Sequence, residues 1–218
     1  AAHDLRNPLG VISGYTQMLG WELEPQLSER HLEHLKLIRQ SVERIDKITR
    51  DILTLERIEQ MARGVLNETV DLRELVRQSF EEYRAAAREK NLTYRLELPD
   101  KKVQVCGDTV FLRESLVNLL SNAIKYTPPE GQVCARLRRE PGRAVFEVED
   151  NGYGIPQDKQ ANLFQPFFRA TSAETKTIKG TGLGLHLVRR IVERHNGQMH
   201  FTSVYGQGST FGFELPLA

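Results

Sequence analysis

The sequence is poor in cysteine and tryptophan, and it carries almost no excess of charge of either sign. Its 218 residues include 2 Cys and 1 Trp, and the formal net charge is +1. Two cysteines cannot make a disulfide framework, so we expect Cys106 and Cys134 to be buried free thiols. A charge this small excludes strong electrostatic attraction to nucleic acid or to a membrane surface, so neither is an expected partner.

The sequence also lacks a long hydrophobic run. No stretch of about 18 consecutive apolar residues occurs, so we expect no membrane span in this chain. We also expect no secretory signal peptide. Hydrophobic residues make up 39% and charged residues 27%, which is typical of a soluble globular protein with a core. We therefore expect a cytoplasmic chain that is a piece of a longer protein. Whether the full-length protein has a membrane anchor is left open.

The first 62 residues have the apolar periodicity of two long helices. Apolar residues recur every three or four positions over residues 5–23, and a near-heptad repeat runs over residues 29–62 after a plausible N-cap at Ser28. Two antiparallel helices cannot bury such a seam by themselves. We expect a second copy to complete a four-helix bundle, with Met18 and Trp21 in its core, and hence a homodimer.

From residue 69 onwards the patterns of helices and strands are mixed. Asp71 is the expected N-cap of a helix that runs to about Lys90. The other expected elements are strands over 92–98, 103–105, 133–138, 144–148, 199–204 and 210–215, and helices over about 109–126 and 182–195. These patterns predict an α+β fold, in which the helical hairpin is followed by a two-layer sandwich with a mixed sheet under helices.

One of these helices carries a polar stripe. Asn118, Asn122 and Lys125 stand at i, i+4 and i+7, so they share one face. Amide oxygens suit a hard cation and a lysine suits phosphate. The alternative interpretation is the solvated face of an ordinary helix, and the stripe alone does not exclude it.

Two glycine-punctuated segments follow the stripe. The segment 150–156 begins with Asp150, which can accept a hydrogen bond from an amine, while its glycines let backbone approach a flat ring. The alternative is a loop that simply needs positive φ. The segment 179–185 (K-G-T-G-L-G-L) runs into a helix N-terminus, whose N–H groups suit phosphate. By itself this turn is a weak signal, since it matches neither the Rossmann nor the Walker pattern.

Taken together, the N-x-x-x-N-A-x-K helix, the D-x-G-x-G loop, residues 164–169 and the G-x-G-x-G turn occur in an order that resembles a known family. They resemble the N, G1, F and G2 boxes of the histidine-kinase catalytic domain, the Bergerat-type ATP-binding fold shared with gyrase and heat-shock chaperones. The resemblance covers residues 69–218. It implies that ATP and Mg²⁺ are the cofactors.

The resemblance also implies a role for each matching residue. Asn118 and Asn122 resemble the residues that bind Mg²⁺ and phosphate, and Asn122 resembles the direct metal ligand. Asp150 resembles the aspartate that recognises the adenine amine. The other residues implied in nucleotide binding are Lys125, Tyr126, Gly152, Gly154, Arg169, Lys179, Gly180, Thr181, Gly182, Leu183 and Gly184. Among these, Lys125 resembles the phosphate-contacting lysine, and Arg169 and Lys179 are candidates for a lid over the γ-phosphate, with a surface arginine as the alternative for Arg169.

A second resemblance covers residues 1–62. The stretch His3-Asp4-Leu5-Arg6-Asn7-Pro8-Leu9 resembles the H box of the dimerisation and phosphotransfer domain. A neutral imidazole is a workable nucleophile, and an adjacent carboxylate such as Asp4 can take its proton. Asn7 lies one turn further along the same face, and in this family such a residue positions water for dephosphorylation of the partner.

These resemblances predict the core of a two-component sensor histidine kinase. It has a phosphotransfer hairpin at 1–64 and a catalytic domain at 69–218, joined by a hinge near 64–68. We expect phosphorylation of His3 from ATP and transfer to an aspartate of a response-regulator receiver domain, with dephosphorylation of that regulator left open. Superfamily ATPases carry a catalytic glutamate where Asn118 stands here, and an amide cannot act as a base. A nucleotide-clamp ATPase and a non-catalytic receiver-binding scaffold remain the alternatives.

Overall fold

The computed structural model describes residues 2–23, 27–60 and 68–218, with side chains from residue 8 onwards except for residue 22. The chain separates into two compact units, Ala1–Glu59 and Gln60–Ala218. The predicted joint at 64–68 and the predicted helix end at Ala62 fall in or next to residues 61–67, outside the described part.

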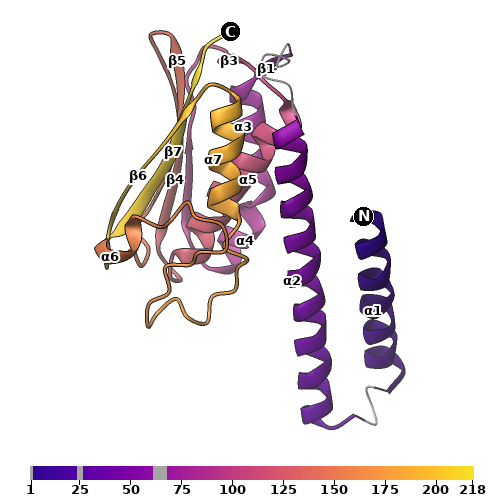
Figure 1. Ribbon diagram of the computed structural model, residues 1–218. Helices are drawn as coiled ribbons and strands as arrows, with labels where there is room; N and C mark the ends of the chain where they lie inside the picture. Colours follow the sequence, from indigo (N-terminus) through magenta and orange to yellow (C-terminus); the bar gives the residue numbers. More distant parts are fainter. Residues whose placement is uncertain (1, 24–26, 61–67) are drawn as a thin grey trace. The chain divides into compact units, whose positions relative to one another are not determined.

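The first unit is a helical hairpin, as predicted. It consists of α1 (Ala2–Leu23) and α2 (Glu29–Gln60) (Figure 1). The N-cap is confirmed, since Ser28 Oγ accepts a hydrogen bond from the His31 N–H at 3.4 Å. Eleven of the fifteen large apolar side chains that are exposed among the described residues belong to this hairpin, including Trp21 (71% exposed) and Met18 (48%).

The second unit is the predicted two-layer sandwich. Its elements are β1 (Thr69–Asp71), α3 (Leu72–Glu82), α4 (Arg84–Glu89), β2 (Thr93–Glu97), β3 (Gln104–Cys106), α5 (Thr109–Tyr126), β4 (Gln132–Glu140), β5 (Arg143–Asp150), α6 (Gln157–Gln160), α7 (Gly184–Arg194), β6 (Gln198–Val204) and β7 (Gly208–Pro216). The five-stranded sheet has the order β2-β4-β5-β7-β6. Strand β2 is parallel to β4 and the other pairs are antiparallel, so the sheet is mixed.

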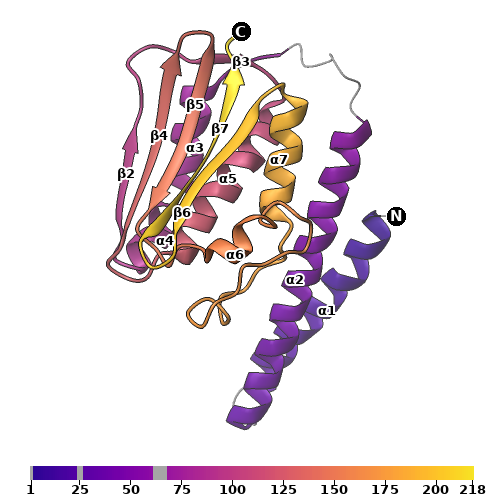
Figure 2. The ribbon, with the colours of Figure 1, turned by 60° about the vertical axis from the view of Figure 1, so that its left-hand side comes forward.

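One face of this sheet is covered by α3, α5 and α7 (Figure 2). The largest side chains between the two layers are fully buried, among them Phe146 on β5, Phe213 on β7 and Leu116 on α5. Burying a side chain of this size stabilises the fold by about 1.5–3 kcal/mol. This packing fixes α5 and α7 side by side over the sheet.

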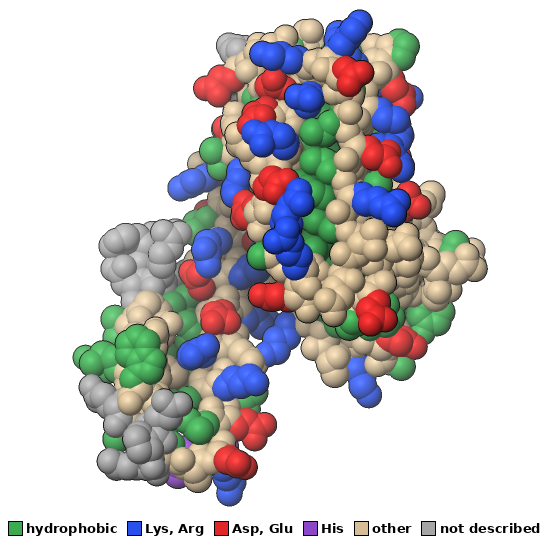
Figure 3. All heavy atoms as spheres, turned by 180° about the vertical axis from the view of Figure 1, so that it is seen from behind, with side chains coloured by type: hydrophobic (Ala, Val, Ile, Leu, Met, Phe, Trp, Pro, Cys, Tyr) green, Lys and Arg blue, Asp and Glu red, His purple; other side chains and the backbone are tan. Residues whose placement is uncertain are grey.

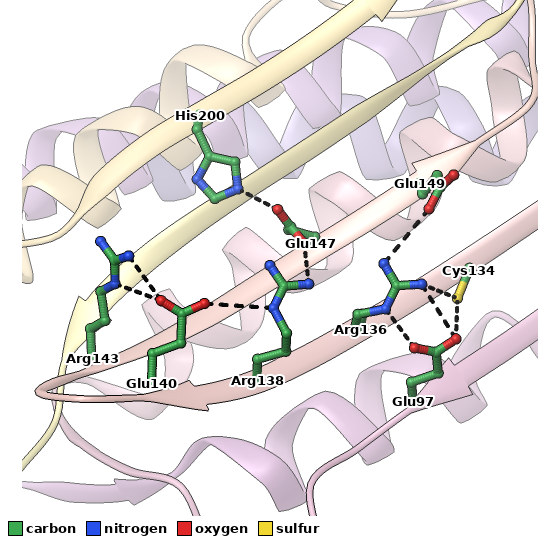
Figure 4. Close-up of polar contacts among 9 residues, drawn as sticks. All are labelled: Glu97, Cys134, Arg136, Arg138, Glu140, Arg143, Glu147, Glu149 and His200. Carbon is green, nitrogen blue, oxygen red and sulfur yellow. Dashed lines mark hydrogen bonds and ion pairs between the residues drawn. The ribbon is translucent and has the colours of Figure 1, made fainter.

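The opposite face of the sheet is lined with charged pairs (Figure 4). Arg138 on β4 pairs with Glu147 on β5, with 2.7 Å between the charged atoms. His200 on β6 reaches the same Glu147 at 3.1 Å, although β7 lies between their strands. The contact between His200 and Glu147 passes over β7 and requires Gly212 there, because a Cβ at this position would lie 2.5 Å from His200 Nε2. Partly exposed pairs of this kind contribute little stability each.

Three local predictions were wrong or incomplete. The expected single helix to Lys90 is two helices, because the Tyr83 N–H bonds Phe80 O three residues back, at 3.2 Å, and the helix ends there. Cys106 is exposed and Cys134 is half-exposed, and both are free thiols. In β3 only Val105 faces inwards, so the alternation of the strand turns Cys106 to solvent. The strand β1 and the short helix α6 were not predicted.

One face of the molecule carries charges of both signs without segregation. On the face that Figure 3 shows, Lys and Arg side chains are interspersed with Asp and Glu, in keeping with a net charge of +1. Within the described ranges, no helix combines the length and the apolar character needed to cross a bilayer.

Candidate functional site

The polar stripe lies on α5, and this helix begins after the predicted N-cap. Asp108 is the N-cap, and its Oδ1 accepts hydrogen bonds from Val110 N–H at 2.8 Å and Phe111 N–H at 3.1 Å. Asn118 is only 5% exposed, while Asn122 and Lys125 are half-buried. A buried asparagine does not fit the alternative of an ordinary solvated face.

The Asn118 amide is held in one orientation. Its Nδ2 donates to the backbone oxygen of Glu114 at 2.9 Å and to Glu114 Oε1 at 3.0 Å. Its Oδ1 faces the glycine turn, because a Cβ on Gly184 would lie 2.7 Å from that oxygen. The stripe on α5 and the start of α7 are therefore in direct contact.

Four predicted residues meet at the other end of the stripe. A Cβ on Gly180 would lie 2.8 Å from Lys125 Nζ, 3.8 Å from Arg169 Nε and 4.0 Å from the Tyr126 hydroxyl. Lys125 Nζ is 5.1 Å from the centre of the Tyr126 ring. Arg169 donates to Ile178 O through its guanidinium. Its Nε is buried and has no hydrogen-bond partner among the described residues, so this cluster has a donor to offer to an anion.

Asp150 stands at the end of β5, as predicted. Its Oδ1 accepts the Gly152 N–H at 2.8 Å, and burial raises the pKa of the carboxyl to about 6. A Cβ on Gly152 would lie 2.4 Å from Tyr126 O, so glycine is needed there for close approach to α5. Gly154 instead has φ +62°, and a Cβ there would lie 2.0 Å from Val204 O. A need for positive φ thus applies to Gly154, where a close backbone contact adds to it, but not to Gly152.

The last glycine segment leads into α7. Gly182 has φ +78°, and a Cβ there would lie 2.6 Å from the carbonyl carbon of Phe167, which itself has φ 63°. Thr181 and Leu183 are buried, with the Thr181 Oγ1 accepting the Leu183 N–H at 3.3 Å, whereas Lys179 is exposed. No side chain of the described residues caps α7, so its first N–H groups suit an anion.

The donors at this site suit magnesium only together with phosphate. Among the described residues there is no group of three or more His, Cys, Asp or Glu side chains that could hold a metal. The amide oxygens of Asn118 and Asn122 are neutral ligands. A hard cation that keeps several waters and takes the rest of its ligands from phosphate fits this donor set.

The three phosphotransfer candidates lie apart from this cluster in the sequence. His3, Asp4 and Asn7 belong to the helical backbone of α1, and their side chains are outside the described part. The structure therefore gives their secondary structure and no side-chain geometry.

Two polar residues at α5 were missed by sequence reasoning. His195, at the end of α7, is buried; its Nε2 accepts the Asp108 N–H at 3.0 Å, and its Nδ1 lies 2.8 Å from Ile191 O. Burial lowers the pKa of His195, which favours the neutral ring that can accept this bond. Lys90 contacts the opposite end of α5. Neither residue belongs to a recognisable motif. The glycine at position 107 was a signal for the packing of His195, because a Cβ there would lie 2.6 Å from the His195 ring.

Comparisons with known proteins agree with this geometry. A family model described as histidine kinase-, DNA gyrase B- and HSP90-like ATPase matches residues 107–218, and one described as His Kinase A (phospho-acceptor) domain matches residues 1–60. The chain is 38% identical, over 99% of its length, to the circadian input-output histidine kinase CikA of Synechococcus elongatus. It is 33% identical, also over 99%, to the histidine protein kinase DivJ of Caulobacter vibrioides. It spans 29% and 36% of these two relatives.

Solved structures show the same relationship. A mycobacterial sensor histidine kinase, MprB, is 31% identical with a TM-score of 0.58; the match covers 69% of this chain and 97% of that one. The crystal structure of full-length ShkA in complex with AMPPNP is 28% identical with a TM-score of 0.77, covering 100% of this chain and 44% of that one. With both domain families matched in this order, the chain belongs to the sensor histidine kinases of two-component systems, as the core that joins a phospho-acceptor domain to an ATPase-like domain.

Proposed function

We propose that this core binds ATP at the α5 stripe and transfers the γ-phosphoryl group to His3. The observation that carries the proposal is the convergence on α5 of the glycine turn, the Asp150 loop and Arg169. The division into a phosphotransfer hairpin at 1–64 and a catalytic domain at 69–218 is part of the proposal. Two compact units and two family models support it.

Each residue of the site has a proposed task. Asp150 accepts the adenine amine, and Tyr126 lies beside the nucleotide. Lys125, Arg169 and Lys179 supply positive charge to the phosphates, and the glycine segment 180–184 supplies backbone N–H groups. Asn122, with Asn118, would hold Mg²⁺, whose charge would stabilise the transferred phosphoryl group.

The transfer itself needs one nucleophile and one base. A ring nitrogen of His3 attacks the γ-phosphorus in line, so a P–N bond forms while the bond to the β,γ-bridging oxygen breaks and ADP leaves. Asp4 takes the proton from the other ring nitrogen. The phosphoryl group then passes to a carboxylate oxygen of a receiver-domain aspartate: the P–N bond breaks, and the proton held by Asp4 returns to the ring, which restores neutral His3. Asn7 would position water when the regulator is dephosphorylated.

The proposed homodimer follows from the surface of the hairpin. Three of its exposed apolar side chains, Ile38, Ile45 and Ile52 on α2, belong to the near-heptad repeat predicted to form the seam of a four-helix bundle. An apolar pocket of about 260 Å³ lies near the loop, lined by Leu19, Leu23, Leu27, His31, His34 and Leu35. A second hairpin would cover both. The proposed receiver partner has a parallel in histidine kinase ThkA, whose structure in complex with response regulator TrrA shares this fold at 24% identity.

A nucleotide-clamp ATPase is the rival function, and one experiment separates the two. The chain is incubated with γ-labelled ATP and Mg²⁺, and both protein-bound label and free phosphate are followed. A histidine kinase retains acid-labile, alkali-stable label on the protein and releases phosphate slowly. Fast phosphate release without protein label would support the clamp, and absence of ATP binding would support a non-catalytic scaffold.

The raised pKa of Asp150 predicts that adenosine binding weakens in mild acid. Binding of the amine favours the ionised carboxyl, whose pKa in the free protein is about 6, so affinity is full above that pKa and falls below it. From about pH 7.5 to about pH 5 the Kd should rise about tenfold. Adenosine has no phosphate groups that titrate, so NMR titration with it isolates the Asp150 effect. A Kd that stays constant over this range would contradict the assignment of Asp150.

A further inference from the structure

Lysine side chains usually extend into solvent, but the side chain of Lys90 extends to the end of a helix. It follows α4, and its ammonium reaches the C-terminal end of α5. There Nζ donates to three carbonyl oxygens, of Ile124 (2.8 Å), Lys125 (3.2 Å) and Thr127 (2.7 Å). An ammonium has three N–H donors, so the donors and acceptors match in number.

The turn that carries Lys90 is fixed to the loop that follows α5. The Lys90 carbonyl accepts the Glu130 N–H at 3.0 Å, and the Thr93 N–H donates to Gly131 O at 2.8 Å. These two backbone bonds join segments that are about 40 residues apart in the sequence. The side chain of Lys90 therefore starts from a fixed base and extends to a fixed target.

The end of α5 needs such a partner. The last carbonyls of a helix lack intrahelical donors and carry partial negative charge. Thr127 Oγ1 donates to Ala123 O at 2.6 Å, and Tyr153 N–H donates to Tyr126 O at 3.2 Å. Lys90 completes this set and brings a positive charge to these carbonyls.

The last turn of α5 is also the turn that carries the phosphate-facing side chains. Lys125 and Tyr126 meet Gly180 and Arg169 there. We propose that Lys90 is a positioning residue of the nucleotide site: it holds the last turn of α5 in place and thereby sets where the Lys125 ammonium lies. This inference rests on the proposed function, because it takes the bound ligand to be ATP.

The test compares Lys90→Met with Lys90→Arg, and uses Lys101→Met as the matched control because Lys101 is exposed in the turn before β3. The Kd for Mg·ATP and for adenosine is measured by calorimetry, and the melting temperature of each variant is recorded. In Lys90→Met the Kd for ATP should rise about tenfold, which corresponds to about 1.4 kcal/mol. Adenosine, which has no phosphate for Lys125 to meet, should lose less than about threefold. Lys90→Arg should recover most of the ATP affinity, and the control should match the parent.

The outcomes are distinct. A folded Lys90→Met variant that binds ATP as tightly as the parent would overturn the inference, as would equal losses for ATP and adenosine. Should Lys90→Met fail to fold, Lys90→Gln, which keeps one donor, takes its place under the same criteria. If the parent itself does not bind ATP, the proposed function fails, and that result is recognisable without any variant.

Discussion

Replacing His3 by glutamine should remove all label transferred from γ-labelled ATP while leaving the Kd for ATP unchanged. Glutamine keeps a polar side chain of similar size but has no nitrogen lone pair able to attack phosphorus. His3 belongs to α1, in the unit that does not contain the α5 site, so nucleotide binding should be intact. The loss of label should be complete, because no other residue is assigned as acceptor.

The matched control is His200→Gln. His200 lies on the outer face of the sheet, opposite α5, where it contacts Glu147. This variant should be labelled like the parent. Label that persists on the His3 variant would place the acceptor elsewhere in the chain. A mixed dimer of the His3 variant and the parent would then show which copy of the chain carries the label.

Replacing Gly184 by alanine should weaken ATP binding by about 30-fold or more, which corresponds to at least about 2 kcal/mol. The new Cβ would stand 2.7 Å from Asn118 Oδ1. Asn118 cannot turn away at low cost, because it is buried and both of its hydrogen bonds to Glu114 would be lost. Either the amide leaves its place in the stripe or the start of α7 moves, and both changes disturb the phosphate end of the site.

Calorimetry measures this effect, and Gly14→Ala is the control. Gly14 lies in α1, and a Cβ there would meet nothing within 4 Å. Its substitution should leave the Kd for ATP unchanged. A Gly184→Ala variant that binds ATP within about twofold of the parent would show that the contact between α7 and Asn118 is not needed for nucleotide binding.

Much of this fold was predictable because its signals are local. Apolar spacing identified α5 and α7, and Asp71 and Asp108 marked helix starts by capping, which the structure confirms. The arrangement of the glycine segments followed from the resemblance and not from spacing. That three separated segments, around Tyr126, Arg169 and Gly180, meet at Lys125 depends on the tertiary arrangement of the chain, which no local pattern contains.

The errors arose where tertiary contacts decide. The break at Tyr83 has no Gly or Pro to announce it, and the exposure of Cys106 depends on which side of a three-residue strand meets the core. Lys90 and His195 look like ordinary polar residues in the sequence. The partners that link them to the two ends of α5 lie 34 or more residues away along the chain, so these roles appear only when the chain is folded.

The ends of α5 have a consequence for the timing of nucleotide exchange. His195 joins the start of α5 to the end of α7, and Lys90 holds the other end. The helix therefore has no loose terminus that could open by fraying, and α5 and α7 should move as one body. Entry and departure of the nucleotide are left to the segment 161–183, which contains no helix or strand. How long ADP stays bound after a turnover should thus be set by this loop, and substitutions in it should change residence time more than they change the shape of the bound state.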